Sequence, residues 1–151
     1  MQDFYERLVG LLGRPEDDRA FTQLVAEIGE SPDFDRGDQT WRACFFSKLG
    51  VHLEADRKRG CWSAVEFHMD TGLVKTLNMN PYKEKLQGGV TPDDLRTDVA
   101  RKLSRLQKLC SDRLSDSYAM PNSMALTFNF DAATERLSHV CVKYNGPPVH
   151  D

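Results

Sequence analysis

Long apolar runs are missing from this sequence of 151 residues, and no segment approaches the roughly 20 apolar residues that a membrane-spanning helix requires. Glycine and proline are also sparse, with ten and seven residues, which excludes collagen-like and low-complexity chains. Because 40% of the residues are hydrophobic, a chain of this length can bury a genuine core without disulfide or metal staples. The sequence therefore predicts a single domain over residues 1–151.

Two further absences favour a reducing, cytoplasmic location. Residues 1–7 lack the basic and then apolar pattern of a secretory leader. The cysteines lie far apart and form no Cys-x-x-Cys pair, so we expect reduced core residues and neither a zinc knuckle nor a thioredoxin motif. They are Cys44, Cys61, Cys110 and Cys141.

A concentrated basic stripe is absent as well. The net charge is −3, and the densest basic segments are only Arg57-Lys58-Arg59 and residues 101–108, so direct nucleic-acid binding is not favoured. Residues 1–40 carry ten acidic and four basic side chains. An acidic segment of this kind fits a basic protein partner, although a solvated helical face would look the same. The partner-binding candidates from this segment are Glu16, Asp17 and Asp18.

Motifs of phosphate and nucleophilic chemistry are missing too. Gly88-Gly89 precedes a predicted helix without the spacing or the lysine of a phosphate-binding loop, and Gly-x-Ser-x-Gly does not occur. We therefore expect a protein that is not an enzyme, with no catalytic residue and no cofactor.

Residues 1–30 are predicted to form a helical hairpin. Apolar residues recur at spacings of three and four in both halves, which is typical of two amphipathic helices. The second helix is expected to open with the acids of Pro15-Glu16-Asp17-Asp18 and to close at Gly29. The apolar positions are Phe4, Leu8, Leu11 and Leu12, then Phe21, Leu24, Val25 and Ile28.

Residues 40–144 read as a sheet-plus-helix core, after a polar linker over 30–39. Thr91 caps and Pro92 opens a helix predicted over Asp94–Leu106, while residues 71–90 form an extended connection. The fold class is α+β: an antiparallel sheet of five or six strands with helices on one face, ending in a frayed tail over 145–151. The predicted strands are Trp41–Phe46, Gly50–Ala55, Cys61–Asp70, Ser117–Met120, Met124–Phe130 and Leu137–Tyr144.

The register of the second and third strands follows from matching their apolar faces. Pairing Leu53 with Val65 leaves a three-residue loop, Lys58-Arg59-Gly60, and sets His52 opposite Glu66. By alternation, Trp62 should then point outward with Glu54, Glu66 and His68.

This outward face carries the best candidate for chemistry. Two histidines and a carboxylate among His52, Glu54, Glu66 and His68 can bind zinc in principle. An open sheet face offers no pocket, however, and cross-strand His–Glu pairs are ordinary surface interactions, so no metal is expected. An exposed Trp62 among charges would be a binding hot spot, whereas a helix packed over it would make it core. The partner-binding candidates on this face are Glu54, Trp62, Glu66 and His68.

One ordered string of motifs resembles a known group of proteins. It runs from Pro81-Tyr82 through a Leu-x-x-Gly-Val turn ending at Val90 and a capped helix with Arg-x-Asp-Val at 96–99, to a closing hairpin after Asp116-Ser117-Tyr118. Over about residues 40–144 this order resembles small bacterial immunity proteins of polymorphic-toxin and secreted-effector systems, such as type VI secretion.

The resemblance implies a non-enzymatic inhibitor that binds a cognate toxin domain in the producer's cytoplasm and blocks its active site or its access to substrate. It carries no catalytic residue. A homodimer of the unbound chain is compatible with the same composition, and neither membrane nor nucleic acid is an expected partner. Two alternatives stay open: a small metal-dependent enzyme on the His52, Glu66 and His68 face, and an adaptor or secretion chaperone that recognises a targeting segment.

Overall fold

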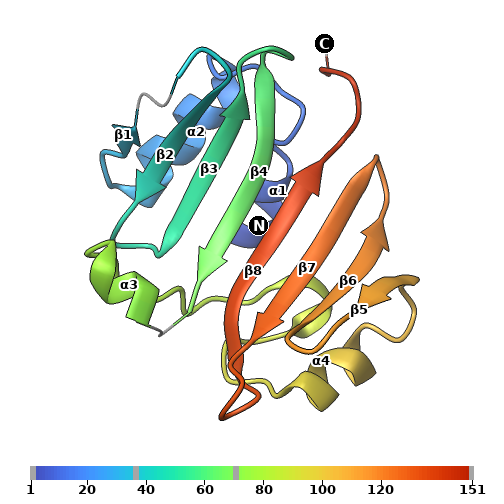
Figure 1. Ribbon diagram of the computed structural model, residues 1–151. Coiled ribbons are helices and arrows are strands. Elements are labelled where there is room, and N and C mark those ends of the chain that lie inside the picture. Colours follow the sequence, from blue (N-terminus) through green and yellow to red (C-terminus); the bar gives the residue numbers. More distant parts are fainter. Residues whose placement is uncertain (1–2, 36–37, 70–71, 150–151) are drawn as a thin grey trace.

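The structure is a computed structural model that describes residues 3–35, 38–69 and 72–149. The strands form one antiparallel sheet in the order β1-β2-β3-β4-β8-β7-β6-β5 (Figure 1). Two four-stranded meanders, β1–β4 and β5–β8, are joined by the pairing of β4 with β8. The strands are β1 Asp33–Asp35, β2 Trp41–Phe46, β3 Val51–Asp56, β4 Cys61–His68, β5 Lys108–Ser111, β6 Ser115–Met120, β7 Met124–Phe130 and β8 Leu137–Tyr144.

The helices begin and end at residues with clear local reasons. Asp3 and Asp18 cap the first two helices by accepting hydrogen bonds from Glu6 N and Ala20 N, both at 2.8 Å. Gly29 ends the second helix in the left-handed conformation, with φ of 73°. The helices are α1 Phe4–Val9, α2 Arg19–Ile28, α3 Gly72–Thr76, the 3₁₀ turn Gln87–Gly89 and α4 Arg96–Lys102. Among the described residues no helix is both long and apolar enough to cross a membrane.

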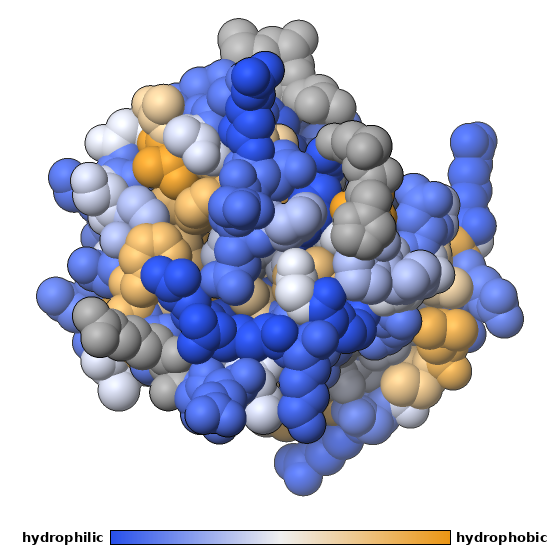
Figure 2. Space-filling view, turned by 90° about the horizontal axis from the view of Figure 1, so that it is seen from above, coloured by the Kyte–Doolittle hydropathy of each residue, from blue (hydrophilic) through white to orange (hydrophobic). Residues whose placement is uncertain are grey.

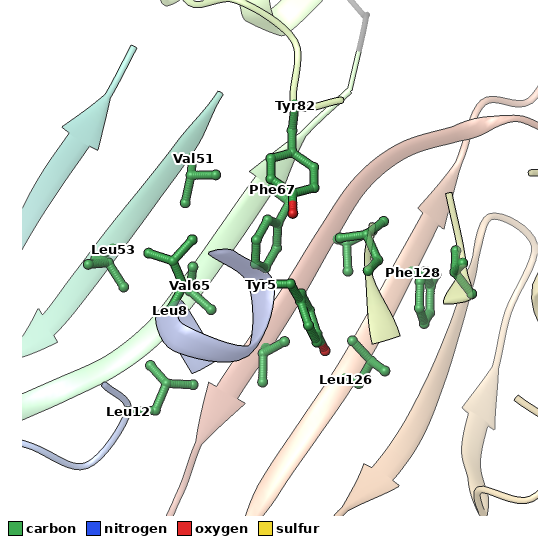
Figure 3. Close-up of a cluster of buried hydrophobic side chains, with 14 of the residues drawn as sticks. Tyr5, Leu8, Leu12, Val51, Leu53, Val65, Phe67, Tyr82, Leu126 and Phe128 are labelled. Carbon is green, nitrogen blue, oxygen red and sulfur yellow. The ribbon is translucent and has the colours of Figure 1, made fainter. Parts of the chain in front are cut away.

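The core lies on one face of the sheet. α1 and α2 lie behind the sheet in Figure 1, and so does the connection that leads to α4. Figure 3 shows Tyr5 and Leu8 of α1 against Val65, Phe67 and other apolar residues of this face. The connection and α4 add further buried side chains to the same core, namely Tyr82, Leu86 and Val90 from the connection and Val99 and Leu103 from α4 and its C-cap. One face of the sheet is therefore fully covered.

The α+β class and the antiparallel sheet are confirmed, but the sheet has eight strands and not five or six. The two extra strands are the edges. β1 lies inside the expected polar linker, and β5 follows the shortened helix. Both are short and exposed along their length, so neither carries the alternating apolar pattern that would identify a strand.

The predicted helix over Asp94–Leu106 is shorter in the structure. Thr91 donates two hydrogen bonds to the carboxylate of Asp94, from its backbone N to Oδ2 at 3.0 Å and from its Oγ1 to Oδ1 at 3.2 Å. This interaction closes a turn instead of opening the helix. α4 begins at Arg96, where Asp98 accepts from Leu95 N at 3.0 Å.

The start of α2 and the C-terminal tail both differ from the sequence-based expectation. Glu16 and Asp17 precede α2 and do not lie in its first turn, because Asp18 is the cap. Of the tail expected to fray, residues 145–149 are held by hydrogen bonds to other parts of the chain: Asn145 N donates to Ser123 O at 3.0 Å, and Val149 N donates to Gly13 O at 2.7 Å. Residues 150 and 151 lie outside the described residues.

The β3–β4 hairpin has the predicted register and one irregularity. Leu53 pairs with Val65 and His52 with Glu66, as predicted. Between Glu54 and Ala55 the register shifts by one residue, so Ala55 pairs with Trp62 and the loop has the four residues 57–60.

That bulge decides the position of Trp62, whose predicted outward placement is wrong. Because one extra residue reverses the alternation, Trp62 faces the core together with Ala55 and is fully buried. Its ring centroid lies 5.1 Å from that of Phe21 on α2. A side chain in this position packs the α2 interface and is not available to a partner.

Three of the four cysteines are buried, as expected, and all four are free. Cys110, on the edge strand β5, is exposed.

Candidate functional site

The face of the sheet opposite the core carries a cluster of five side chains from three strands. His52 and Glu54 come from β3, Glu66 and His68 from β4, and His139 from β8. We call these five residues the His–Glu cluster. Since directly paired residues of antiparallel strands share a face, the pairs His52–Glu66 and His68–His139 bring the cluster together.

Glu66 is the centre of the cluster. Its Oε2 lies 2.5 Å from Nε2 of His52, and its Oε1 lies 2.6 Å from Nε2 of His139. Oε1 of Glu54 lies 3.3 Å from the same His52 nitrogen. The two imidazoles therefore approach different oxygens of the Glu66 carboxylate, and Glu54 joins the cluster on the side of His52.

The second nitrogen of each of these imidazoles is also engaged. Nδ1 of His52 lies 2.7 Å from Nε2 of His68, and Nδ1 of His139 lies 3.2 Å from the side-chain amide of Asn129 on β7. The His52 and His68 rings are stacked, with centroids 4.9 Å apart. These contacts fix the orientation of both rings that face Glu66.

The cluster has a defined protonation pattern at neutral pH. Burial opposes ionisation of Glu66, but hydrogen bonds from His139 and His52 outweigh it and hold the pKa of Glu66 well below its usual range. Burial likewise opposes protonation of His52, but the carboxylates of Glu54 and Glu66 raise its pKa to about 9. Burial and the neighbouring charges of His52 and His139 lower the pKa of His68 to about 4. Thus His52 donates from both nitrogens, and neutral His68 accepts.

A shallow hollow of about 460 Å³ opens beside the cluster. Its rim is partly apolar, because Trp41 and Leu77 are 40% and 37% exposed. By contrast, the end of the molecule drawn in Figure 2 has a mostly hydrophilic surface, on which apolar residues form only small patches. The hollow is lined by Asp35, Trp41, Ala43, Phe45, His52, Glu54, Glu66, His68, Leu77 and His139.

The sequence-predicted site residues divide into three groups. Glu54, Glu66 and His68 share the outer face, although His68 is only 3% exposed and supports the cluster from below. Trp62 lies in the core. The remaining three acids precede α2, which packs on the core face, so the structure does not bring them together with the cluster.

Two of those three acids have structural roles. Glu16 pairs with Arg42 at 3.4 Å, and Asp18 both caps α2 and pairs with Arg14 at 3.2 Å. Asp17 is exposed.

Two functional candidates were missed: His139 and Asn129. Alternation along the last strand, in which Val140 and Val142 face the core, already indicates that His139 points outward. That pattern does not show that β8 pairs with β4, because the two strands are separated by more than sixty residues of sequence.

No family model and no curated protein matches the sequence. Among solved structures, the fold is similar to an extracellular protein containing an SCP domain from Bacillus anthracis str. Ames, with a TM-score of 0.59 and 12% sequence identity. The match covers 96% of this chain and 48% of that one, so this chain spans about half the length of the solved protein. At this identity the likeness shows a shared arrangement of strands and helices and nothing about activity.

The protonation pattern predicts a pH effect on stability that is specific to His68. An unfolded histidine binds a proton near pH 6.5, whereas buried His68 stays neutral until about pH 4, so stability present above that window is lost on acidification. Between roughly pH 7.5 and 5, the metal-free wild type should lose about 2 kcal/mol more unfolding free energy than His68→Gln, which retains an acceptor for His52. Urea denaturation at a series of pH values measures this, and parallel curves for the two proteins would contradict it.

Proposed function

We propose that this chain is an immunity protein: a binding protein that neutralises a cognate toxin or effector domain in the cytoplasm of the producing cell. It acts by covering the active site of that domain or the path of its substrate. Two things support the proposal, namely the motif order that resembles immunity proteins over about residues 40–144, and a sheet with one large face left open for contact.

The contact surface in this proposal is the outer face of β1–β4. The observation that carries it is the contrast between the two faces: α1, α2 and the long connection cover the core face, while the outer face presents exposed Trp41 and Leu77 beside carboxylates. A half-exposed tryptophan on a polar-rimmed surface is typical of binding hot spots.

The chemistry of the hollow points to a basic partner surface. Glu54 is partly exposed at its edge and Asp35 lines it, and the indole of Trp41 offers an aromatic face. An arginine or lysine side chain can pair with such carboxylates and stack on the indole. The carboxylates would thus bind the charge of a basic toxin side chain, and the indole of Trp41 would pack against its aliphatic part.

Charge reversal tests which surface binds. The full chain, tagged at one end, is used to capture partners from its native cells, and the captured domain is expressed with and without the chain. We expect the partner domain to arrest growth and the wild-type chain to restore it. Glu54→Lys should weaken the purified complex at least tenfold, because it places a cation opposite the basic surface.

The matched control is Asp17→Lys, which changes charge equally on the far side of the sheet and should alter affinity less than threefold at physiological salt. A larger effect of Asp17→Lys would transfer the contact surface to the segment before α2. A captured partner that is harmless, or that is bound through a targeting segment, would reject neutralisation and favour a secretion chaperone.

A further inference from the structure

We propose that the outer face binds one divalent transition-metal ion of the zinc class, held by Nε2 of His52, Nε2 of His139 and the carboxylate of Glu66, with Glu54 as a fourth ligand. This inference goes beyond toxin binding and does not depend on it.

Three of the four donors lie close to one another, and the fourth, His139, contacts one of them. One ligand atom from each of His52, Glu54 and Glu66 lies within 4.8 Å of the others, and Nε2 of His139 is 2.6 Å from Glu66. Zinc bonds of about 2.0–2.1 Å in tetrahedral geometry separate ligand atoms by about 3.3 Å. Side-chain rotations would have to lengthen the 2.5 Å and 2.6 Å contacts of Glu66 and turn Nε2 of His139 toward the other three donors.

Each histidine ligand has a polar neighbour at its second ring nitrogen. A ligating imidazole normally makes a hydrogen bond through its other nitrogen, which fixes the ring and its tautomer. Nδ1 of His52 can donate to Nε2 of His68, which lies 2.7 Å away. Nδ2 of Asn129 lies 3.2 Å from Nδ1 of His139, so the Asn129 amide would turn its Oδ1 to this nitrogen when Nε2 binds a metal. Two such contacts, from different strands, are more than cross-strand surface pairs require.

The type of ion follows from the ligands. Imidazole nitrogens favour zinc, copper, iron or nickel, whereas magnesium and calcium prefer oxygen alone. Two carboxylates balance the charge of a divalent ion. A metal ion at Nε2 of His52 would displace the proton that this nitrogen shares with Glu66, so a proton is released on binding.

The hollow gives the ion an accessible side. Trp41 and Leu77 border the cluster without supplying ligand atoms, and the hollow they line is open to solvent. A coordination position on that side would be free for a carboxylate, imidazole or water from outside the chain. The ion would also tie β3, β4 and β8 together, because its ligands come from all three strands.

The test uses the full chain without a histidine tag, carrying Cys110→Ser so that the exposed thiol cannot bind metal. After treatment with chelator, zinc binding is measured by equilibrium dialysis and titration calorimetry. We expect one equivalent of zinc, release of a proton, and a rise in melting temperature with zinc concentration.

Variants separate this site from adventitious binding. His139→Ala and Glu66→Gln should each weaken zinc at least tenfold, and Asn129→Ala should weaken it about tenfold by freeing the ring of His139. Glu27→Gln, an exposed glutamate on α2 across the sheet, should bind zinc as the wild type does. Circular dichroism confirms that each variant is folded.

No zinc binding by the folded wild type, or binding that His139→Ala leaves unchanged, would overturn the metal site. Partner binding is measured separately, as the affinity of the chelator-treated complex and as growth rescue by the Asn129→Ala variant. A failed metal site and a failed toxin-binding proposal therefore give different results.

Discussion

Replacing Trp62 with alanine is expected to lower the free energy of unfolding by about 4 kcal/mol. The indole is fully buried between the sheet and α2, with its centroid 5.1 Å from that of Phe21. Truncation leaves a large cavity at the only tryptophan on the core face. Urea denaturation followed by circular dichroism measures the loss.

Two variants sharpen this expectation. Trp41→Ala should cost less than about 1 kcal/mol, because Trp41 is 40% exposed on the outer face. Trp62→Phe should cost much less than Trp62→Ala, because within the described part of the chain the indole N–H has no hydrogen-bond partner to lose. Equal losses for Trp62→Ala and Trp41→Ala would mean that the bulge in β4 does not turn Trp62 inward.

Gly50→Ala is expected to destabilise the protein by about 3 kcal/mol or more. Gly50 has φ of 83°, and a Cβ there would lie 2.4 Å from O of Asn80 and 2.5 Å from N of Tyr82. Both are backbone atoms of the connection that crosses the sheet end, so they cannot move aside as a side chain would. The cost of the left-handed backbone conformation and the cost of the steric overlap therefore add to the destabilisation.

Gly60→Ala is the matched control, since Gly60 has φ of 75° but no atom within 4 Å of the added Cβ. It should cost about 1 kcal/mol, from the left-handed conformation alone. Denaturant midpoints for the two variants give the comparison, and a difference below about 1 kcal/mol would show that the connection does not pack on Gly50.

Local patterns predict most of this fold. Alternation and turn signals give β2 to within a residue of its observed bounds, and matching apolar faces gives the pairing of Leu53 with Val65. The edge strands β1 and β5 escape prediction because an exposed short strand has no buried face to pattern. The bulge in β4 cannot be predicted from the local sequence, because a tertiary contact favours the inward position of Trp62: α2 packs over that point of the sheet.

The candidate site is predictable within one hairpin and not beyond it. His52 and Glu66 face each other because both belong to consecutive strands whose register is fixed by their own apolar residues. His139 and Asn129 join them only through the pairing of β4 with β8, which closes a long connection and depends on packing of the whole chain. A cluster that reads as an ordinary surface pair in sequence becomes a five-residue site in three dimensions.

The acids before α2 illustrate a different ambiguity of sequence patterns. Glu16 and Asp18 stand in a segment whose excess negative charge suggests a docking surface, yet one pairs with Arg42 and the other caps a helix. Composition cannot distinguish charges used within the fold from charges offered to a partner, because both are hydrophilic and close to the surface.

The most direct test of the account is a hydroxyl-radical footprint of the chain, free and in complex with its captured partner domain. If the outer face of β1–β4 is the contact surface, oxidation of Trp41 and Leu77 should fall several-fold in the complex, while the exposed residues Leu109 and Leu114 of the other meander should react as before. Protection of Leu109 and Leu114 with Trp41 still reactive would contradict it.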